Sequence, residues 1–147
     1  MTDFGMMDHL RISVKDLQRS KLFWVPVLQY LGYSLLDENG ERVCFGLSNG
    51  PGSRPRILFS EAIPQEHQIE YELGQLGYHH FAFRANSRQQ VDGLYELLGL
   101  IGATVQGPPS TYDYSPGYYA VYFRDPDNLK FELVFVPNEG TPFIDVS

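Results

Sequence analysis

Hydrophobic and polar residues alternate in two widely separated stretches of the chain, residues 9–14 and 80–84. Alternation with a period of two is typical of a strand that buries one face. Each stretch is followed by a segment in which apolar residues recur at helical spacing, and each segment ends at a glycine, Gly32 or Gly102. A glycine in this position commonly ends a helix. The pattern therefore predicts a strand and a helix at the same place in each half of the chain.

Both predicted helices carry start signals, and each is followed by shorter strand patterns. Asp16 is a plausible N-cap, and Ser87 with Gln90 forms a capping box. Pro26 lies inside the first helix and is expected to distort it. Further strands are predicted at residues 33–36, 42–47 and 55–59 in the first half, with a hairpin turn at Asn39-Gly40 between the first two, and at 103–106 and in a hairpin over 118–136 in the second half.

The chain therefore repeats the order strand–helix–strand–strand–strand. We predict an α+β fold of two βαβββ modules, residues 1–60 and 78–136, with a linker at 61–77 and a surface tail at 137–147. A repeated unit of this kind does not bury its sheet alone. We expect each sheet to hold a helix on one face and to curve around a cavity on the other, forming one cupped sheet with the helices outside.

A strong turn signal, Asp-Pro-Asp-Asn at residues 125–128, separates two apolar strands in the second module. In the second of these strands Phe131 and Leu133 fall on one face and Glu132 on the other. An unpaired buried carboxylate is costly, so Glu132 should have a cation, a hydrogen-bond donor or a metal as its partner.

The repeat brings two histidines into the same argument. His9 and His80 occupy equivalent places on the first strand of each module, facing away from the helix-packing residues. Aligning the hairpins places Leu58 where the second module has Glu132, and leucine does not bind metal. Two histidines and one carboxylate suit a divalent metal that keeps positions open for substrate or water.

Plainer interpretations stay open beside this one. A single histidine on a strand is more often packed or exposed than a ligand, and Glu132 could form a salt bridge with Arg11 or Arg84. Arg11 either clamps a substrate anion or partners an acid at the surface. Strand parity turns His79 away from His80, which predicts a structural or exposed role, and His67 reads as a solvated linker residue.

Composition narrows the class of function. The net charge of −7 and the lack of a basic run argue against nucleic acid and anionic membrane surfaces as partners. No apolar stretch has the length of a membrane-spanning helix, and no signal peptide is visible. Cys44 is the single cysteine, which suits a reducing compartment. We expect a cytoplasmic protein.

Three motifs, at residues 8–16, 80–83 and 122–132, resemble the vicinal oxygen chelate superfamily. This group contains glyoxalase I, bleomycin-resistance proteins, fosfomycin-resistance thiol transferases and extradiol dioxygenases. The resemblance implies paired βαβββ modules around a divalent metal, which would be iron, manganese, nickel or zinc, and a homodimer. Carried over to this chain, it implies His9, His80 and Glu132 as ligands.

Departures from the superfamily patterns shape the functional expectation. Glyoxalase I has a fourth ligand where Leu58 stands, which argues against that activity. The loop at residues 107–115 does not match the serine-rich, potassium-binding loop of the thiol transferases. Extradiol dioxygenases have a tyrosine ten residues before the glutamate, as Tyr122 precedes Glu132 here. Tyr122 and Glu132 are therefore candidate catalytic residues, and Arg11 and Tyr122 candidate substrate-binding residues.

Two functions from different classes follow. The first is a metal-dependent enzyme, of lyase/isomerase, dioxygenase or thiol-transferase type, that binds a small molecule through two oxygens on the metal. The metal would act as a Lewis acid on a carbonyl or enolate. The second is a bleomycin-resistance-like protein that sequesters a ligand without catalysis, because this fold alone does not establish chemistry.

Overall fold

The computed structural model describes residues 4–48 and 52–137. The chain divides into two compact units, Met1–Ile69 and Glu70–Ser147, and each is described by itself. Most of the predicted loop at 49–52 and nearly all of the predicted tail at 137–147 lie outside the described residues.

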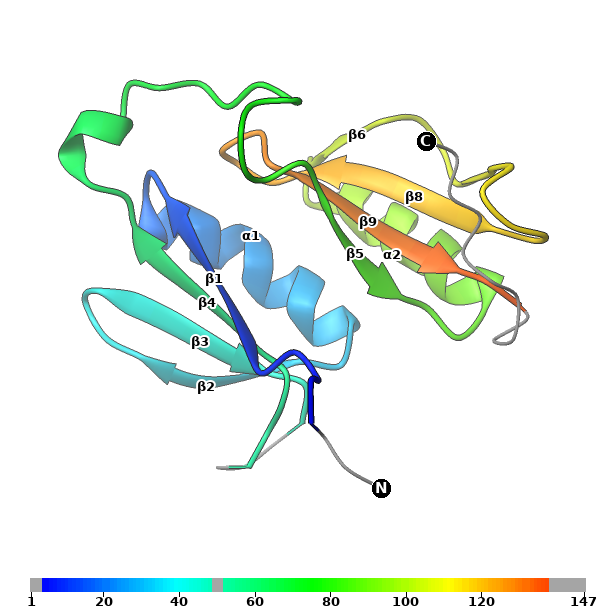
Figure 1. Ribbon diagram of the computed structural model, residues 1–147, viewed down its shortest axis with the longest axis horizontal. Coiled ribbons are helices and arrows are strands. Elements are labelled where there is room, and N and C mark those ends of the chain that lie inside the picture. Colours follow the sequence, from blue (N-terminus) through cyan, green and yellow to red (C-terminus); the bar gives the residue numbers. More distant parts are fainter. Residues whose placement is uncertain (1–3, 49–51, 138–147) are drawn as a thin grey trace. The chain divides into compact units, whose positions relative to one another are not determined.

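The first unit is a four-stranded sheet with a helix against one face (Figure 1). Strand β1 runs parallel to β4, and β3 pairs antiparallel with both β4 and β2, which gives the order β1-β4-β3-β2. Its elements are β1 (His9–Val14), α1 (Leu17–Tyr30), β2 (Ser34–Glu38), β3 (Arg42–Gly46), β4 (Arg56–Glu61) and the 3-10 helix η1 (Pro64–Glu66).

The second unit repeats this arrangement with the order β5-β9-β8-β6, and β5 is again parallel to the last strand (Figure 1). Its elements are β5 (Phe81–Arg84), α2 (Arg88–Leu100), β6 (Thr104–Val105), β7 (Ser110–Thr111), β8 (Tyr119–Arg124) and β9 (Lys130–Phe135). The α+β fold with two βαβββ units is therefore confirmed. One detail differs from the prediction: β7 forms inside the predicted loop, because Ser110 and Thr111 pair with the start of β8.

Strand register confirms the alignment of the two repeats. In the first unit His9 lies opposite Arg56, and Leu58 follows two residues later on the same strand. In the second unit Phe81, the residue after His80, lies opposite Phe131. Glu132 therefore occupies the place in its sheet that Leu58 occupies in the other sheet.

Each helix begins and ends at the residues that the sequence indicates. The Asp16 carboxylate accepts a hydrogen bond from the backbone N–H of Arg19, and the Ser87 hydroxyl accepts one from Gln90. Gly32 and Gly102 follow the helices with positive φ angles of 90° and 70°, a conformation that suits glycine. α1 continues through Pro26 as one helix. No helix of the described residues is long and apolar enough to cross a membrane.

Aromatic residues fill the space between helix and sheet in both units. In the first unit the Trp24 indole stacks on Phe59 with ring centroids 5.2 Å apart, and both side chains are buried. In the second unit Phe131 stacks against Phe123 at 5.8 Å, and Leu94 of α2 is fully buried. Large buried aromatic side chains contribute much of the hydrophobic stabilisation of a small domain.

The turn between β8 and β9 forms as the sequence predicts. The Asp125 carboxylate accepts hydrogen bonds from the backbone N–H groups of Asp127 (3.0 Å) and Leu129 (2.8 Å). Asn128 has a φ angle of +67°, which asparagine tolerates better than most residues. This local network fixes where β9 begins and therefore which face Glu132 occupies.

Candidate metal centre

Glu132 lies on the sheet face opposite the helix, as strand parity predicts. It pairs in register with Ala82 on β5 and with Tyr122 on β8, so the three side chains share one face. Its neighbours Phe131 and Leu133 point to the other face and are buried there. Glu132 itself is only 1% exposed, which makes it a buried carboxylate in an otherwise apolar strand.

His80 approaches this carboxylate from the start of β5. Its Nε2 lies 3.4 Å from Glu132 Oε2. Two donor atoms that each lie about 2.1 Å from one ion are about 3.4 Å apart at the tetrahedral angle. The spacing of the pair therefore fits shared coordination of a divalent ion.

A tyrosine holds the other oxygen of the carboxylate. The Tyr118 hydroxyl donates a hydrogen bond to Glu132 Oε1, which leaves Oε2 on the side of His80. Burial raises the pKa of the Glu132 carboxyl, while hydrogen bonds from Tyr118 and Tyr122 and the charge of Lys130 act in the opposite direction. The two hydroxyls thus stabilise the ionised form that a metal ligand requires.

His80 is held as a neutral ring. Burial lowers its pKa first, and the nearby charges of Lys130 and His79 lower it further. Its Nδ1 lies 2.7 Å from Nδ1 of His79, so one ring donates to the other. This contact corrects the prediction from strand parity that His79 turns away. β5 begins only at Phe81, so the alternation of a pleated strand does not apply to the two histidines.

Four tyrosines form a wall around the carboxylate. The rings of Tyr112 and Tyr114 stack at 5.7 Å, Tyr112 meets Tyr122 edge to face at 5.4 Å, and Tyr114 meets Tyr118 in the same way at 5.1 Å. The Lys130 ammonium lies 4.4 Å from the centroid of the Tyr122 ring, within cation–π range. We refer to Tyr112, Tyr114, Tyr118 and Tyr122 as the tyrosine wall.

Sequence reasoning placed Tyr122 near the site, left Tyr118 open between cavity wall and ordinary strand residue, and missed Lys130. The signal for Tyr118 was present, because residues four apart on one strand share a face and Tyr118 stands four before Tyr122. Lys130 stands two residues before Glu132 and shares its face by the same rule.

A hollow opens beside the tyrosine wall. It has a volume of about 350 Å³, which is within the usual range for small-molecule pockets. Its lining comes from the end of β7 and the loop between β7 and β8, with Thr111, Tyr112, Asp113, Ser115, Pro116, Gly117 and Tyr118.

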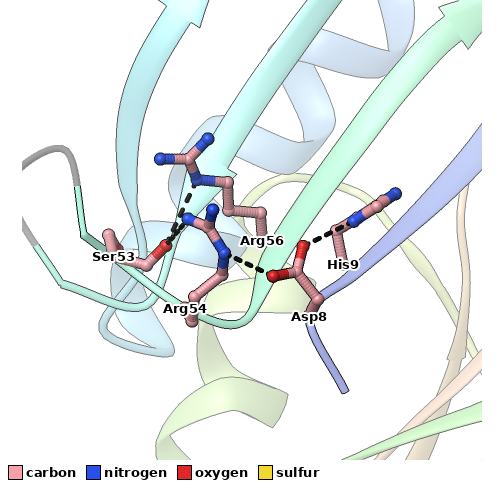
Figure 2. Close-up of polar contacts among 5 residues, drawn as sticks. All are labelled: Asp8, His9, Ser53, Arg54 and Arg56. Atoms are coloured by element: carbon pink, nitrogen blue, oxygen red, sulfur yellow. Dashed lines mark hydrogen bonds and ion pairs between the residues drawn. The ribbon is translucent and has the colours of Figure 1, made fainter. Parts of the chain in front are cut away.

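His9 lies in the first unit, within a small polar network of its own. Figure 2 shows the Asp8 carboxylate between two partners: Oδ1 is 2.6 Å from His9 Nδ1, and Oδ2 accepts from Arg54 Nε at 2.7 Å. Arg54 also donates to the carbonyl oxygen of Ser53, which accepts from Arg56 as well. The hydrogen bond with His9 and the guanidinium of Arg54 lower the pKa of Asp8. The His9 ring is therefore engaged through Nδ1.

The other residues predicted in the first unit lie on the same face as His9. Arg11 is exposed, and its Nε donates to the Ser60 hydroxyl at 2.7 Å. Leu58 lies between Arg11 and Cys44 in register, on the face where Glu132 stands in the other unit.

His67 is more than a solvated linker residue, since its Nε2 lies 2.8 Å from the carbonyl oxygen of Ala62.

The second unit thus brings together His80, Glu132 and Tyr122, and the first unit holds His9 and Arg11. Within residues 4–48 and 52–137, no group of three His, Cys, Asp or Glu side chains is close enough to hold a metal ion. In the second unit, His80 and Glu132 are placed as two ligands of one metal would be. The approach of His9 to them as a third ligand stays a prediction.

Comparison with known proteins identifies the family. The family model for the Glyoxalase/Bleomycin resistance protein/Dioxygenase superfamily matches residues 6–133. The chain belongs to this superfamily. The match spans both βαβββ units and all three predicted ligands.

Individual relatives agree with this assignment. The uncharacterized protein YqjT of Bacillus subtilis is 33% identical over 129 residues, which cover 87% of this chain and 97% of that protein. A Bacillus halodurans protein that is provisionally assigned as a glyoxalase has a crystal structure with a TM-score of 0.75 and 26% identity, covering 91% of this chain and 98% of that one. Lactoylglutathione lyase from Agrobacterium tumefaciens has a TM-score of 0.62 and 22% identity, covering 93% and 98%, and this likeness shows the fold alone.

Proposed function

We propose that this superfamily member is a metal-dependent enzyme in which His9, His80 and Glu132 would hold a divalent metal that binds two oxygens of a small-molecule substrate. The observation that carries the proposal is the 3.4 Å spacing between His80 and a carboxylate that is 1% exposed. Burying a carboxylate is costly, and a fold retains one more readily where it has a task.

The chemistry of the metal would be that of a Lewis acid, which polarises a bound carbonyl oxygen or makes a bound hydroxyl more acidic. Tyr118 would keep the Glu132 carboxylate in place and ionised through its hydrogen bond to Oε1. Burial raises the pKa of the Tyr122 hydroxyl, so this group stays protonated. When substrate binds, it would turn from Glu132 and donate its hydrogen bond to a substrate oxygen. Arg11, with an exposed guanidinium on the His9 face, would bind a substrate carboxylate.

A second candidate is a sequestering protein of the bleomycin-resistance type. The tyrosine wall and the adjoining hollow of about 350 Å³ favour it, because stacked aromatic rings bind planar or cationic ligands without any metal. In that case Glu132 and its hydroxyl partners would orient the ligand rather than a metal.

Metal content separates the two candidates. The protein would be purified without chelator, and its iron, manganese, nickel and zinc measured by mass spectrometry in parent and His80→Ala. His67→Ala is the matched control, because it also removes one histidine but leaves Glu132 and its neighbours intact. About one metal per chain in the parent and the control, and none in His80→Ala, supports the enzyme. A metal-free parent that still binds aromatic ligands supports sequestration.

Turnover would then be screened with compounds that carry two adjacent oxygens, such as hemithioacetals, α-hydroxy ketones and catechols, after reconstitution with each metal. Conversion of one class by the parent and loss of conversion in Glu132→Gln would identify the reaction type. Because Leu58 replaces a fourth ligand, we expect little conversion of hemithioacetals.

We also propose a cytoplasmic homodimer, in which His9 meets the His80–Glu132 pair either of its own chain or of the second copy. Mixing the variants His9→Ala and Glu132→Gln decides between these arrangements. Recovery of metal binding in the mixture means that a site takes residues from both chains. No recovery means that each chain builds its own site.

A further inference from the structure

We propose that Asp8 and His79, the residues that directly precede the two predicted histidine ligands, are positioning residues that fix the tautomers of His9 and His80. Each would hold the proton of its histidine on Nδ1 and leave Nε2 available for the metal. The expected effect on metal binding rests on the proposed function, whereas the assignment of the tautomers rests on the geometry within each unit.

The first unit carries the argument through a carboxylate. Asp8 Oδ1 lies 2.6 Å from His9 Nδ1, a normal hydrogen-bond distance. An ionised carboxylate only accepts, so the proton must lie on Nδ1 of His9. Arg54 Nε donates to Oδ2 at 2.7 Å, which holds the carboxylate in this orientation (Figure 2). Nε2 of His9 is then the nitrogen with a lone pair.

The second unit allows the same arrangement with a different partner. Nδ1 of His79 and Nδ1 of His80 lie 2.7 Å apart, so one nitrogen donates and the other accepts. If His80 Nδ1 donates, its Nε2 presents a lone pair toward the ion position beside Glu132 Oε2. The 3.4 Å between Nε2 and Oε2 is longer than an ordinary N–H···O hydrogen bond, so the carboxylate competes weakly for the ring proton.

The segment before β5 is itself fixed to the hairpin, which gives His79 a defined place. The Tyr78 hydroxyl donates to the carbonyl oxygen of Lys130 at 2.5 Å, and the side-chain amide of Asn128 donates to the carbonyl oxygen of Tyr71 at 3.2 Å. These two bonds tie residues 71–78 to the β8–β9 hairpin that carries Glu132. The contact between His79 and His80 therefore follows from a restrained backbone.

Contact between sequence neighbours has the same physical origin in both units. A pleated strand sends successive side chains to opposite faces, so such contacts form only outside it. Asp8 precedes the first residue of β1, and His79 stands two residues before the first residue of β5. Asp8 and His79 thus both lie just before a strand, where the backbone is not yet pleated, and each contacts the histidine ring that follows it.

The two partners differ in charge, which predicts unequal effects. A carboxylate that accepts from the ring makes Nε2 a stronger donor, and loss of such partners typically lowers metal affinity about ten- to a hundredfold. An imidazole ring brings no negative charge, so His79 supplies orientation alone. We therefore expect Asp8→Ala to reduce zinc affinity more than His79→Ala does.

Nuclear magnetic resonance tests the assigned tautomers directly. Long-range proton–nitrogen spectra of the histidine rings distinguish a proton on Nδ1 from one on Nε2, and would be recorded on metal-free and zinc-bound protein. The parent should carry the proton on Nδ1 in His9 and His80. In Asp8→Ala and His79→Ala the affected ring should shift toward the Nε2–H form. Asp8→Asn and His79→Asn, whose amide oxygens accept a hydrogen bond, should restore the parent tautomer.

Zinc affinity, measured by competition with a chelating indicator, tests the expected effect on metal binding. Asp8→Ala should bind about ten- to a hundredfold more weakly and Asp8→Asn should recover part of the loss. The matched control is Asp37→Ala, because Asp37 forms a comparably exposed pair with Arg42 at 3.1 Å and touches no histidine in the described chain. Its zinc affinity should stay within about twofold of the parent, as expected for a surface pair.

The outcomes are distinguishable. Parent-like tautomers in both alanine variants overturn the inference. The predicted tautomer shifts together with weaker zinc binding support it in full. If the parent binds no metal while the rings shift as predicted, the metal role of the site is refuted and the positioning of the two histidines is supported.

Discussion

The two units share the order of their main strands and the register of their first and last strands, and the contrast between them is sharpest at one pair of equivalent positions. Leu58 in the first sheet lies between Arg11 and Cys44. Glu132 in the second sheet lies between Ala82 and Tyr122, accepts from Tyr118 and is 1% exposed. The two positions have matching backbone pairing, so the chemistry differs through side chains alone.

This difference shows how a repeated scaffold divides its tasks. A leucine on the open face needs no partner, whereas a buried carboxylate needs donors, and the second unit supplies them in Tyr118 and Tyr122. The first unit instead presents arginines and a histidine that an aspartate orients. One unit is thus built around a buried anion, and the other around an exposed polar face.

The largest expected effects concern the cores that both units need. Trp24→Ala should lower the free energy of unfolding by about 3–5 kcal/mol and Leu94→Ala by about 2–5 kcal/mol, because both side chains are fully buried between helix and sheet. Urea titration followed by circular dichroism measures both. Leu22→Ala, on the same helix as Trp24 but 79% exposed, should change stability by less than about 0.5 kcal/mol. Equal losses for Trp24→Ala and Leu22→Ala would contradict the assigned packing of α1.

The second-largest expected effect is on zinc affinity, and it comes from substituting Glu132 and Leu58, which occupy equivalent positions in the two units. Glu132→Gln should reduce zinc affinity more than about a hundredfold, because an amide replaces a charged ligand in a buried site. Leu58→Gln makes a comparable change in the other unit and should leave affinity near that of the parent. Calorimetric titration of zinc into each variant provides the measurement. Equal losses in both variants would mean that the two units do not differ in the way proposed.

Removing a hydroxyl from the tyrosine wall should shift the pH dependence of metal binding. The Tyr118 hydroxyl bond lowers the pKa of Glu132, so Tyr118→Phe should raise that pKa. Protons then compete with the metal at higher pH, and the midpoint of zinc binding should move upward. A hydrogen bond to a charged group contributes about 1.5–3 kcal/mol, which corresponds to about one to two pH units.

Tyr119→Phe is the matched control for this change, since Tyr119 donates to Asp92 instead of Glu132. Zinc binding should keep its parent midpoint there. Tyr122→Phe should shift the midpoint upward less than Tyr118→Phe does, because Tyr122 lowers the pKa of Glu132 less than Tyr118 does, and metal content at neutral pH should stay near the parent value. It should weaken substrate binding or turnover about ten- to a hundredfold, if its hydroxyl donates to the substrate. A downward midpoint shift in Tyr118→Phe would show that its hydroxyl does not stabilise the carboxylate.

The smallest effect comes from making the first unit resemble the second. Leu58→Glu adds a carboxylate on the face of His9 and should increase zinc affinity, by about tenfold, or 1.4 kcal/mol. The affinity of Leu58→Gln gives the baseline for a polar side chain without charge. Weaker zinc binding in Leu58→Glu than in Leu58→Gln would place Leu58 away from the metal.

Much of this comparison could be predicted from the sequence, because it depends on short-range patterns. Alternation, helix caps and the Asp125 turn are local signals, and together they determined the two modules and the face of Glu132. The contact between His79 and His80 was predicted wrongly, since parity reasoning assumed a strand one residue too early. Tyr118 was left open and Lys130 was missed, because strand spacing gives the face on which a side chain lies but not how far it leans along the sheet toward a partner.

The central claim, that His9, His80 and Glu132 share one metal, is tested most directly by X-ray absorption spectroscopy of the zinc-bound protein. The spectrum of the parent should show two imidazole rings, with nitrogen and oxygen donors at about 2.0–2.2 Å. With zinc added at concentrations high enough to fill the weakened sites, which lose their metal during purification, His9→Ala and His80→Ala should each show one imidazole, while His67→Ala keeps both. Two imidazoles that persist in His9→Ala would contradict the claim, because His9 would then not be a ligand.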